Sequence, residues 1–138
     1  MDYYGNPVTT LIEELARLPG IGRKTAQRLA FHIIGMPEDE VNALSVALVH
    51  ARKEVRYCRQ CCTLTDSEIC PICSDPSRDH GSIMVVEDSR DMAAYEKTKQ
   101  YNGLYHILHG VISPLSHVGP DDLRIRELLN RVADGSVR

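Results

Sequence analysis

The chain of 138 residues has no tryptophan and only one phenylalanine, Phe31, so its hydrophobic cores must be aliphatic and modest in size. No apolar run approaches the roughly 20 residues of a membrane-spanning helix, and we expect no contact with a membrane. The first residues do not resemble a signal peptide, which favours a cytoplasmic location. The remaining composition, with 43% hydrophobic and 25% charged residues, is that of an ordinary globular protein. The length allows one ordinary domain or two to three small ones.

The formal net charge of −3 argues against a wholly basic nucleic-acid binder, but the charges are unevenly distributed. Residues 15–60 carry eight basic and four acidic side chains, a net charge of +4, so the rest of the chain carries −7. A polyanionic partner is therefore expected to bind the N-terminal half of the chain.

Four of the five cysteines form two C-x-x-C pairs, Cys58 with Cys61 and Cys70 with Cys73. Each pair can turn two thiolates toward one point about 2.3 Å from a tetrahedral Zn²⁺. The short segment between the pairs can fold one pair onto the other, and four thiolates leave no open position for water or substrate. The pattern predicts one structural zinc ion.

Two disulfides, four unrelated thiols and redox-active C-x-x-C chemistry are the alternatives to zinc. Cys62 would remain a free thiol, which fits a reducing compartment better than a disulfide-forming one. A redox-active pair is expected between a strand and a helix, and the flanking sequence does not predict that context. We expect Cys62 to be a buried or loose thiol rather than a fifth ligand.

The N-terminal part of the chain is predicted to be helical. The capping box Thr-Leu-Ile-Glu at residues 10–13 predicts the start of a short helix. A second helix is expected at about residues 23–34, and a third, amphipathic helix has Pro37 in its first turn. Between the first two helices, the sequence Leu-Pro-Gly-Ile-Gly at residues 18–22 predicts a tight turn.

This turn is a candidate phosphate-binding site. Gly20 and Gly22 permit a tight backbone without side-chain bulk, so the amides that open the second helix can face an anion. Arg23, Lys24 and Arg28 flank the same point, and a nucleic-acid phosphate would fit there without any base being read. The alternative is a plain helix–turn–helix corner with solvated cations. The pattern is similar to the helix-hairpin-helix motif of DNA-binding proteins.

The C-terminal part is predicted to be an α/β unit that follows a polar linker at residues 74–81. Strands and helices are expected to alternate at residues 83–87, 88–100, 104–109 and 121–133. This order implies parallel strands joined by right-handed crossovers. Because two parallel strands make a poor sheet, we expect a fragment of a longer protein, or a domain that a partner completes.

Glu87 ends the first of these strands and Asp88 follows it, at the edge where open α/β sheets place ligands. The arrangement resembles the Toprim fold, which pairs such a glutamate with a D-x-D motif to hold Mg²⁺. The sequence contains no D-x-D, and one carboxylate alone holds Mg²⁺ weakly. An acidic cluster that offsets a helix dipole, a surface for a protein partner and a catalytic site remain the alternatives for Glu87 and Asp88.

The order of hairpin, cysteine pairs and Toprim-like unit resembles the RecR family of bacterial recombination mediators. The resemblance is carried by residues 18–22, 24–32, 57–73, 75–79, 85–88 and 103–114. It implies a multi-part α+β fold: a helix-hairpin-helix domain at residues 1–56, a four-cysteine zinc finger or ribbon at 57–79 and a partial Toprim domain with parallel strands at 80–138. Family members usually continue further, so we expect a C-terminally shortened member.

The resemblance further implies a DNA-binding mediator without catalysis, which cooperates with RecO and RecF and assists loading of the recombinase RecA onto gapped DNA during repair. It implies a homo-oligomer, at least a dimer and possibly a tetramer, in the nucleoid-associated cytoplasm. The residues assigned to these roles are Gly20, Gly22, Arg23, Lys24 and Arg28 for DNA, Cys58, Cys61, Cys70 and Cys73 for Zn²⁺, and Glu87 and Asp88 for a protein partner. The alternatives are a Mg²⁺-dependent Toprim nuclease or primase-like enzyme that uses Glu87, and an interaction adaptor that binds no DNA.

Overall fold

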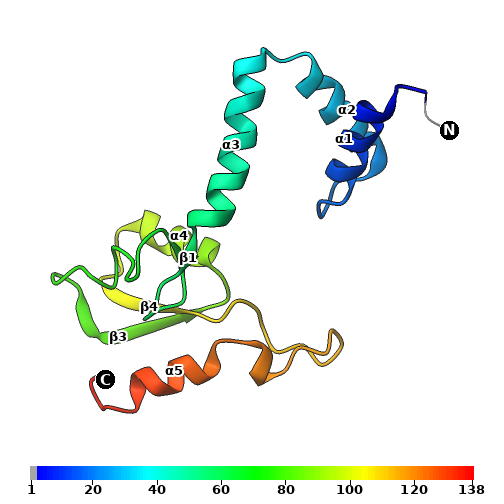
Figure 1. The fold of residues 1–138 in the computed structure, drawn as a ribbon. Helices are drawn as coiled ribbons and strands as arrows, with labels where there is room; N and C mark the ends of the chain where they lie inside the picture. The colour runs from blue at the N-terminus through cyan, green and yellow to red at the C-terminus, as the bar shows by residue number, and fades with distance from the viewer. Residues whose placement is uncertain (1–2) are drawn as a thin grey trace. The chain divides into compact units, whose positions relative to one another are not determined.

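The computed structural model describes residues 3–138, and the chain divides into two compact units between Arg52 and Lys53 (Figure 1). Each unit has its own cluster of buried residues. Their elements confirm the predicted α+β class. Within the described residues, no helix combines the length and the apolar character needed to cross a bilayer.

The N-terminal unit is built on two short helices, α1 (Asn6–Ala16) and α2 (Arg23–Ile34). Ile12 of α1 is buried against Ala26 and Ala30 of α2, which are fully buried. The two alanines allow a close approach of the helices, because α2 contributes only methyl groups to this contact. This packing holds the turn between the helices at one edge of the unit.

The expected start of α1 at Thr10 is wrong, because the helix begins at Asn6. Pro7 lies in its first turn, where the missing N–H has no intrahelical partner to lose. The hydroxyl of Thr10 donates to Oδ1 of Asn6 at 3.3 Å within the helix instead of capping its start. The expected bounds of α2 are confirmed.

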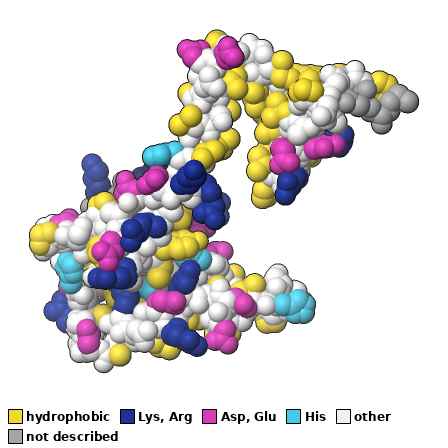
Figure 2. Space-filling model, viewed as in Figure 1, with side chains coloured by type: hydrophobic (Ala, Val, Ile, Leu, Met, Phe, Trp, Pro, Cys, Tyr) yellow, Lys and Arg dark blue, Asp and Glu magenta, His cyan; other side chains and the backbone are white. Residues whose placement is uncertain are grey.

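The predicted third helix is α3 (Glu38–Glu54), and it begins directly after Pro37 instead of including Pro37 in its first turn. None of its residues is buried. Its apolar side chains are mostly open to solvent, with Leu48 and Val46 each 66% exposed, and Val41 alone among them is partly buried. Figure 2 shows hydrophobic side chains along α3 at the surface of the viewed face. The apolar face that the sequence predicts for α3 is therefore not buried in the N-terminal or C-terminal core.

The C-terminal unit begins with a two-stranded antiparallel ribbon, β1 (Arg56–Tyr57) and β2 (Leu64–Thr65). A zinc ribbon is expected here, but no sequence pattern locates its strands. It continues with strand β3 (Asp79–Val86), helix α4 (Ser89–Thr98) and strand β4 (Gly103–Ile107). Strands β3 and β4 pair in parallel, as predicted. All residues of β4 are buried, so this strand forms the centre of the unit.

Two expected boundaries in this unit are wrong. Strand β3 begins at Asp79, inside the expected linker, because Asp79 already pairs with Gly103 before a register shift leads into Ile83. The expected helix at residues 121–133 is interrupted and consists of the 3₁₀ turn η1 (Pro120–Asp122) and helix α5 (Ile125–Val132). Between them Leu123 has an extended backbone and a buried side chain, so core packing overrides the helical pattern.

Candidate zinc centre and nucleic-acid interface

The four paired cysteines converge on one point in the C-terminal unit. The Sγ atoms of Cys58, Cys61, Cys70 and Cys73 all lie within 4.8 Å of one another, and all four side chains are buried. Sγ of Cys61 lies 3.6 Å from Sγ of Cys70, far beyond the roughly 2.05 Å of a disulfide bond. The cysteines are free, so disulfide pairing is not the arrangement in this fold.

The backbone prepares these sulfurs for negative charge. The amide of Cys70 donates to Sγ of Cys58 at 3.3 Å, and the amide of Cys73 donates to Sγ of Cys70 at 3.4 Å. Hydrogen bonds from Cys61 and Cys73 lower the pKa of the Cys70 thiol to about 2, whereas the bond to Cys70 raises the pKa of Cys61. Ionisation of one thiol therefore disfavours ionisation of the next, and a divalent cation among the four sulfurs would allow all four to be thiolates.

The cysteine cluster is tied directly to the parallel sheet. The amide of Ile107 in β4 donates to the carbonyl of Cys61 at 2.8 Å. The hydroxyls of Thr63 and Ser89 lie 3.0 Å apart, which joins the segment before β2 to the first residue of α4. The cysteines share one core with Val86, Tyr105 and Ile107. A metal ion bound there would stabilise the whole C-terminal unit.

Cys62 is buried but lies outside the group of four, as expected. Its backbone is left-handed (φ 67°), and its carbonyl accepts a hydrogen bond from Nε2 of His109. Burial raises the pKa of the Cys62 thiol. No sequence pattern indicates the contact with His109, because the two residues are distant along the chain.

The turn between α1 and α2 has the predicted tight geometry. The amide of Ile21 donates to the carbonyl of Leu18 at 3.2 Å, and Gly20 has a φ of 77°. Gly22 caps α2 with an extended backbone (φ −78°, ψ 172°), and no side chain caps this end of the helix. A Cβ atom at Gly22 would meet nothing within 4 Å. The fold itself therefore does not require glycine at residue 22.

The three predicted cations lie at the start of α2 and on its exposed surface. Arg23 and Lys24 occupy the first turn, and Arg28 follows one turn later. All three side chains are exposed, while Ala26 and Ala30 face the core. The structure thus places Gly20, Gly22, Arg23 and Lys24 at one helix end, where the first amides lack intrahelical acceptors, with Arg28 one turn further along α2.

Glu87 and Asp88 lie where β3 gives way to α4, and they have different surroundings. Glu87 is exposed. Asp88 is the N-cap of α4: its Oδ1 accepts from the amide of Asp91 at 3.0 Å and its Oδ2 accepts from Arg90 at 2.8 Å. The hydrogen bond from Arg90 lowers the pKa of Asp88. Asp88 therefore already stabilises the helix start, in addition to any role at a surface.

Within residues 3–138, the four cysteines are the one group of three or more His, Cys, Asp or Glu side chains close enough to share a metal ion. The part of the chain that the structure describes thus brings no three carboxylates close enough to share a metal ion at Glu87.

Three known families match successive parts of the chain. The RecR helix-hairpin-helix family matches residues 8–52, the four-cysteine zinc finger domain of RecR matches residues 55–75, and the Toprim domain matches residues 81–135. The zinc finger match and the convergence of the four buried sulfurs agree. Together they fit one structural zinc ion, held by Cys58, Cys61, Cys70 and Cys73.

Three curated relatives carry the name recombination protein RecR. The protein of Carboxydothermus hydrogenoformans is 53% identical over 95% of this chain and 66% of its own length. That of Moorella thermoacetica is 53% identical over 99% of this chain and 68% of its own length. That of Heliobacterium modesticaldum is 52% identical over the whole chain and 69% of its own length. The chain thus spans about two thirds of the length of these relatives.

Proposed function

Because the chain belongs to the RecR family of recombination proteins, we propose that it is a DNA-binding recombination mediator without catalytic activity of its own. It would hold gapped DNA, in its single-stranded or duplex part, during recombinational repair, and it would assist loading of the recombinase. Binding to DNA would associate it with the nucleoid. RecO- and RecF-type proteins and further copies of the chain are its proposed partners.

The hairpin between α1 and α2 is the observation that carries this proposal. Its backbone amides at Gly22 and in the first turn of α2 lack a side-chain cap, Arg23 and Lys24 lie in that same turn, and Arg28 follows one turn later. A helix N-terminus with uncapped amides favours an anion. The open space around Gly22 allows a phosphate to approach the backbone closely.

Binding of this kind reads the DNA backbone and not the bases. The affinity should therefore be independent of sequence and should fall as salt is added, because each neutralised phosphate releases counterions. The zinc ion has a structural role in this proposal, since four buried thiolates leave it no position for a substrate.

Glu87 and Asp88 are proposed to contribute to a surface for a protein partner. Glu87 is exposed at the carboxyl end of β3, where its side chain is open to a basic group of a partner. Asp88 would act there mainly by fixing the start of α4, because its carboxylate already accepts from the amide of Asp91. The variant Glu87→Lys should weaken binding of a RecO-type partner in a pull-down while DNA binding persists.

The DNA proposal is tested by the double variant Lys24→Glu, Arg28→Glu in a gel-shift titration at several salt concentrations. We expect loss of binding to both single-stranded and duplex DNA, with the fold intact by circular dichroism. The matched control is Lys97→Glu, Arg126→Glu, which makes the same charge change on two exposed residues of the C-terminal unit. Equal loss in both variants, or unchanged binding in the first, would refute the assignment.

A plasmid-nicking assay with Mg²⁺ separates this function from a Toprim nuclease. Nicking by the wild-type chain that disappears in Glu87→Gln would overturn the non-catalytic proposal. If the wild-type chain binds no DNA even at low salt, the DNA-binding proposal fails and an interaction adaptor that binds no DNA is the function that remains.

A further inference from the structure

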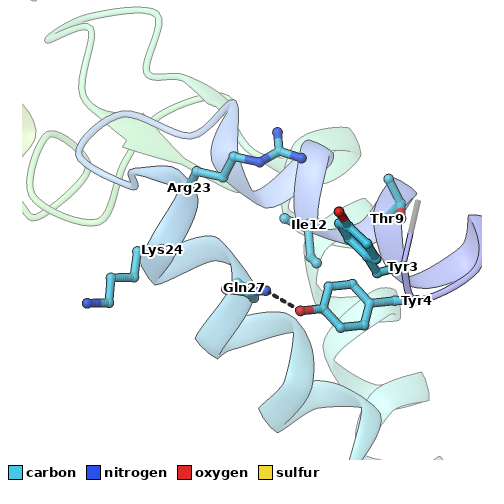
Figure 3. A pocket seen from close by; sticks show the side chains of 7 residues that line it. All are labelled: Tyr3, Tyr4, Thr9, Ile12, Arg23, Lys24 and Gln27. Carbon is cyan, nitrogen blue, oxygen red and sulfur yellow. Dashed lines mark hydrogen bonds between the residues drawn. The ribbon is translucent and has the colours of Figure 1, made fainter. Parts of the chain in front are cut away.

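A cavity of about 450 Å³ lies beside the start of α2, next to the hairpin. This volume is within the roughly 300–1,000 Å³ typical of small-molecule pockets. Figure 3 shows the side chains that line it, which are Tyr3, Tyr4, Thr9, Ile12, Arg23, Lys24 and Gln27. All of them belong to the N-terminal unit. No sequence motif points to the two tyrosines.

Two aromatic rings form one side of this cavity (Figure 3). Tyr4 is fixed in place: its hydroxyl accepts from Nε2 of Gln27 at 2.9 Å, and its ring meets the ring of Phe31 edge to face at 5.3 Å. Tyr3 is 77% exposed, so a ligand can cover its ring without displacing any atom of the part of the chain that the structure describes. A flat aromatic group is the natural partner for such a ring.

The charge of the lining residues restricts the ligand further. Arg23 and Lys24 both line the cavity, and among its described lining residues there is no carboxylate. Figure 3 shows these two cations on α2, away from the tyrosine rings. A ligand that contacts both the tyrosine rings and the two cations carries a flat ring and a negative charge. A nucleotide has this chemistry.

Arg23 and Lys24 also form the first turn of α2, where the phosphate is proposed to bind. The cavity and the phosphate site therefore share two residues, and one strand can occupy both. We propose that the cavity takes an unpaired base of a DNA strand, stacked on Tyr3, while the phosphate of that strand lies at the hairpin. This inference rests on the proposed DNA binding and adds a preference for unpaired nucleotides.

The preference follows from the geometry of DNA. In a duplex both faces of each base are covered by neighbours, so a base reaches Tyr3 only where the strand is single. Base–aromatic stacking is tolerant of sequence because every base has a π-face. The pocket would thus discriminate single strands and gap edges from intact duplex without reading sequence.

The test compares Tyr3→Ala with Tyr3→Phe in the full chain. Fluorescence anisotropy would measure binding to a short oligothymidine, to a blunt duplex of equal length and to an abasic sugar–phosphate strand. We expect Tyr3→Ala to weaken binding of oligothymidine about ten- to a hundredfold and to leave the duplex and the abasic strand unchanged. Tyr3→Phe should bind like the wild type, because it keeps the ring. Tyr95→Ala, which removes a 48% exposed tyrosine of α4, is the matched control.

The outcomes separate this inference from the proposed function. If Tyr3→Ala binds oligothymidine like the wild type while Lys24→Glu, Arg28→Glu does not, the base pocket is refuted and DNA binding stands. If the wild-type chain binds none of the three strands, the proposed function itself fails. If free thymidine monophosphate at micromolar concentration displaces the oligonucleotide, the pocket belongs to a free nucleotide, which overturns the proposal.

Discussion

Arg78 and Glu96 form a two-pronged ion pair: Nη1 of Arg78 donates to Oε1 of Glu96 at 2.8 Å, and Nη2 donates to Oε2. Nη1 of Arg78 also donates to the carbonyl of Gly103, and the hydroxyl of Tyr105 donates to Oε1 of Glu96 at 2.7 Å. The pair thereby joins the segment before β3 to α4 and to the start of β4. Its side chains are 13% and 26% exposed, so water screens it only in part.

Glu96→Gln should destabilise the C-terminal unit by about 2 kcal/mol, because it leaves the mostly buried charge of Arg78 with only the longer ion pair to Asp75, at 3.9 Å. Urea unfolding of zinc-loaded protein measures the change. The control is Glu68→Gln: Arg59 and Glu68 form a pair with side chains 73% and 56% exposed, and its loss should cost less than about 1 kcal/mol. An equal loss in the free energy of unfolding for the two variants would contradict a special stabilising role of the pair between Arg78 and Glu96.

The same pair predicts a dependence on pH. The hydrogen bond from Arg78 lowers the pKa of Glu96. A carboxylate with a lowered pKa stabilises the fold above the usual glutamate range and loses that effect as pH falls through the lowered value. The difference in stability between the wild type and Glu96→Gln should therefore shrink in acid. A difference that stays constant down to acid pH would show that the charge of Glu96 is not its source.

Removal of one zinc ligand should release the metal and unfold the ribbon of β1 and β2. Cys70→Ser is expected to contain no zinc and to lose cooperative unfolding of the C-terminal unit, because its sulfur accepts from the amide of Cys73 and faces Cys61. Zinc content by elemental analysis and thermal unfolding check this. Cys62→Ser, which removes the fifth thiol, should retain one zinc per chain. Zinc loss in both variants would place Cys62 among the ligands.

The features predictable from sequence are those with local causes. Gly22 and Gly35 flank α2, so its bounds follow from local signals, and the C-x-x-C spacing by itself brings Cys58 and Cys61 together. The features that sequence did not predict arise from distant contacts. The break at Leu123 depends on a core that the chain builds elsewhere.

The candidate DNA-binding site likewise combines local features that the sequence predicts with distant contacts that it does not. The cations of the hairpin are adjacent along the chain, and the sequence indicated their position on α2. The cavity beside them needs Gln27 of α2 to fix the hydroxyl of Tyr4, a contact between residues far apart in sequence. Periodicity and spacing carry no signal for such a contact.

His106 predicts a second dependence on pH, near neutrality. It is fully buried on β4, where Nε2 donates to the carbonyl of Arg124 at 2.7 Å and Nδ1 accepts from Arg131 at 3.1 Å. Burial lowers the pKa of this imidazole, and the positive charge of Arg131 acts in the same direction. The hydrogen bond to the carbonyl of Arg124 and the charge of Glu127 act in the opposite direction, while His109 adds to the lowering. A proton on Nδ1 would have to displace the hydrogen bond from Arg131.

The unfolded chain binds a proton at His106 near pH 6.5, whereas the folded chain binds it only at lower pH. Stability should therefore fall as pH drops below about 6.5, by at most roughly 1.4 kcal/mol per pH unit for one group. His106→Gln should flatten this slope in urea titrations across that range, with zinc content measured at each pH. His50→Gln, on the exposed surface of α3, should leave the slope unchanged. An unchanged slope in His106→Gln would assign the effect to another group.

The two glycines of the hairpin should separate stability from DNA binding. Gly20 has a φ of 77°, so Gly20→Ala should cost about 1 kcal/mol or more through backbone strain. Gly22 has an ordinary extended backbone with open space around its Cβ direction, and serine is a better N-cap, so Gly22→Ser should stabilise α2 by a few tenths of a kcal/mol. The new side chain would nevertheless stand where a phosphate must approach the amides. Gly22→Ser should thus raise the thermal midpoint of the N-terminal unit and weaken DNA binding in the same preparation. A variant that gains stability and keeps full affinity would show that DNA does not contact the backbone at this turn.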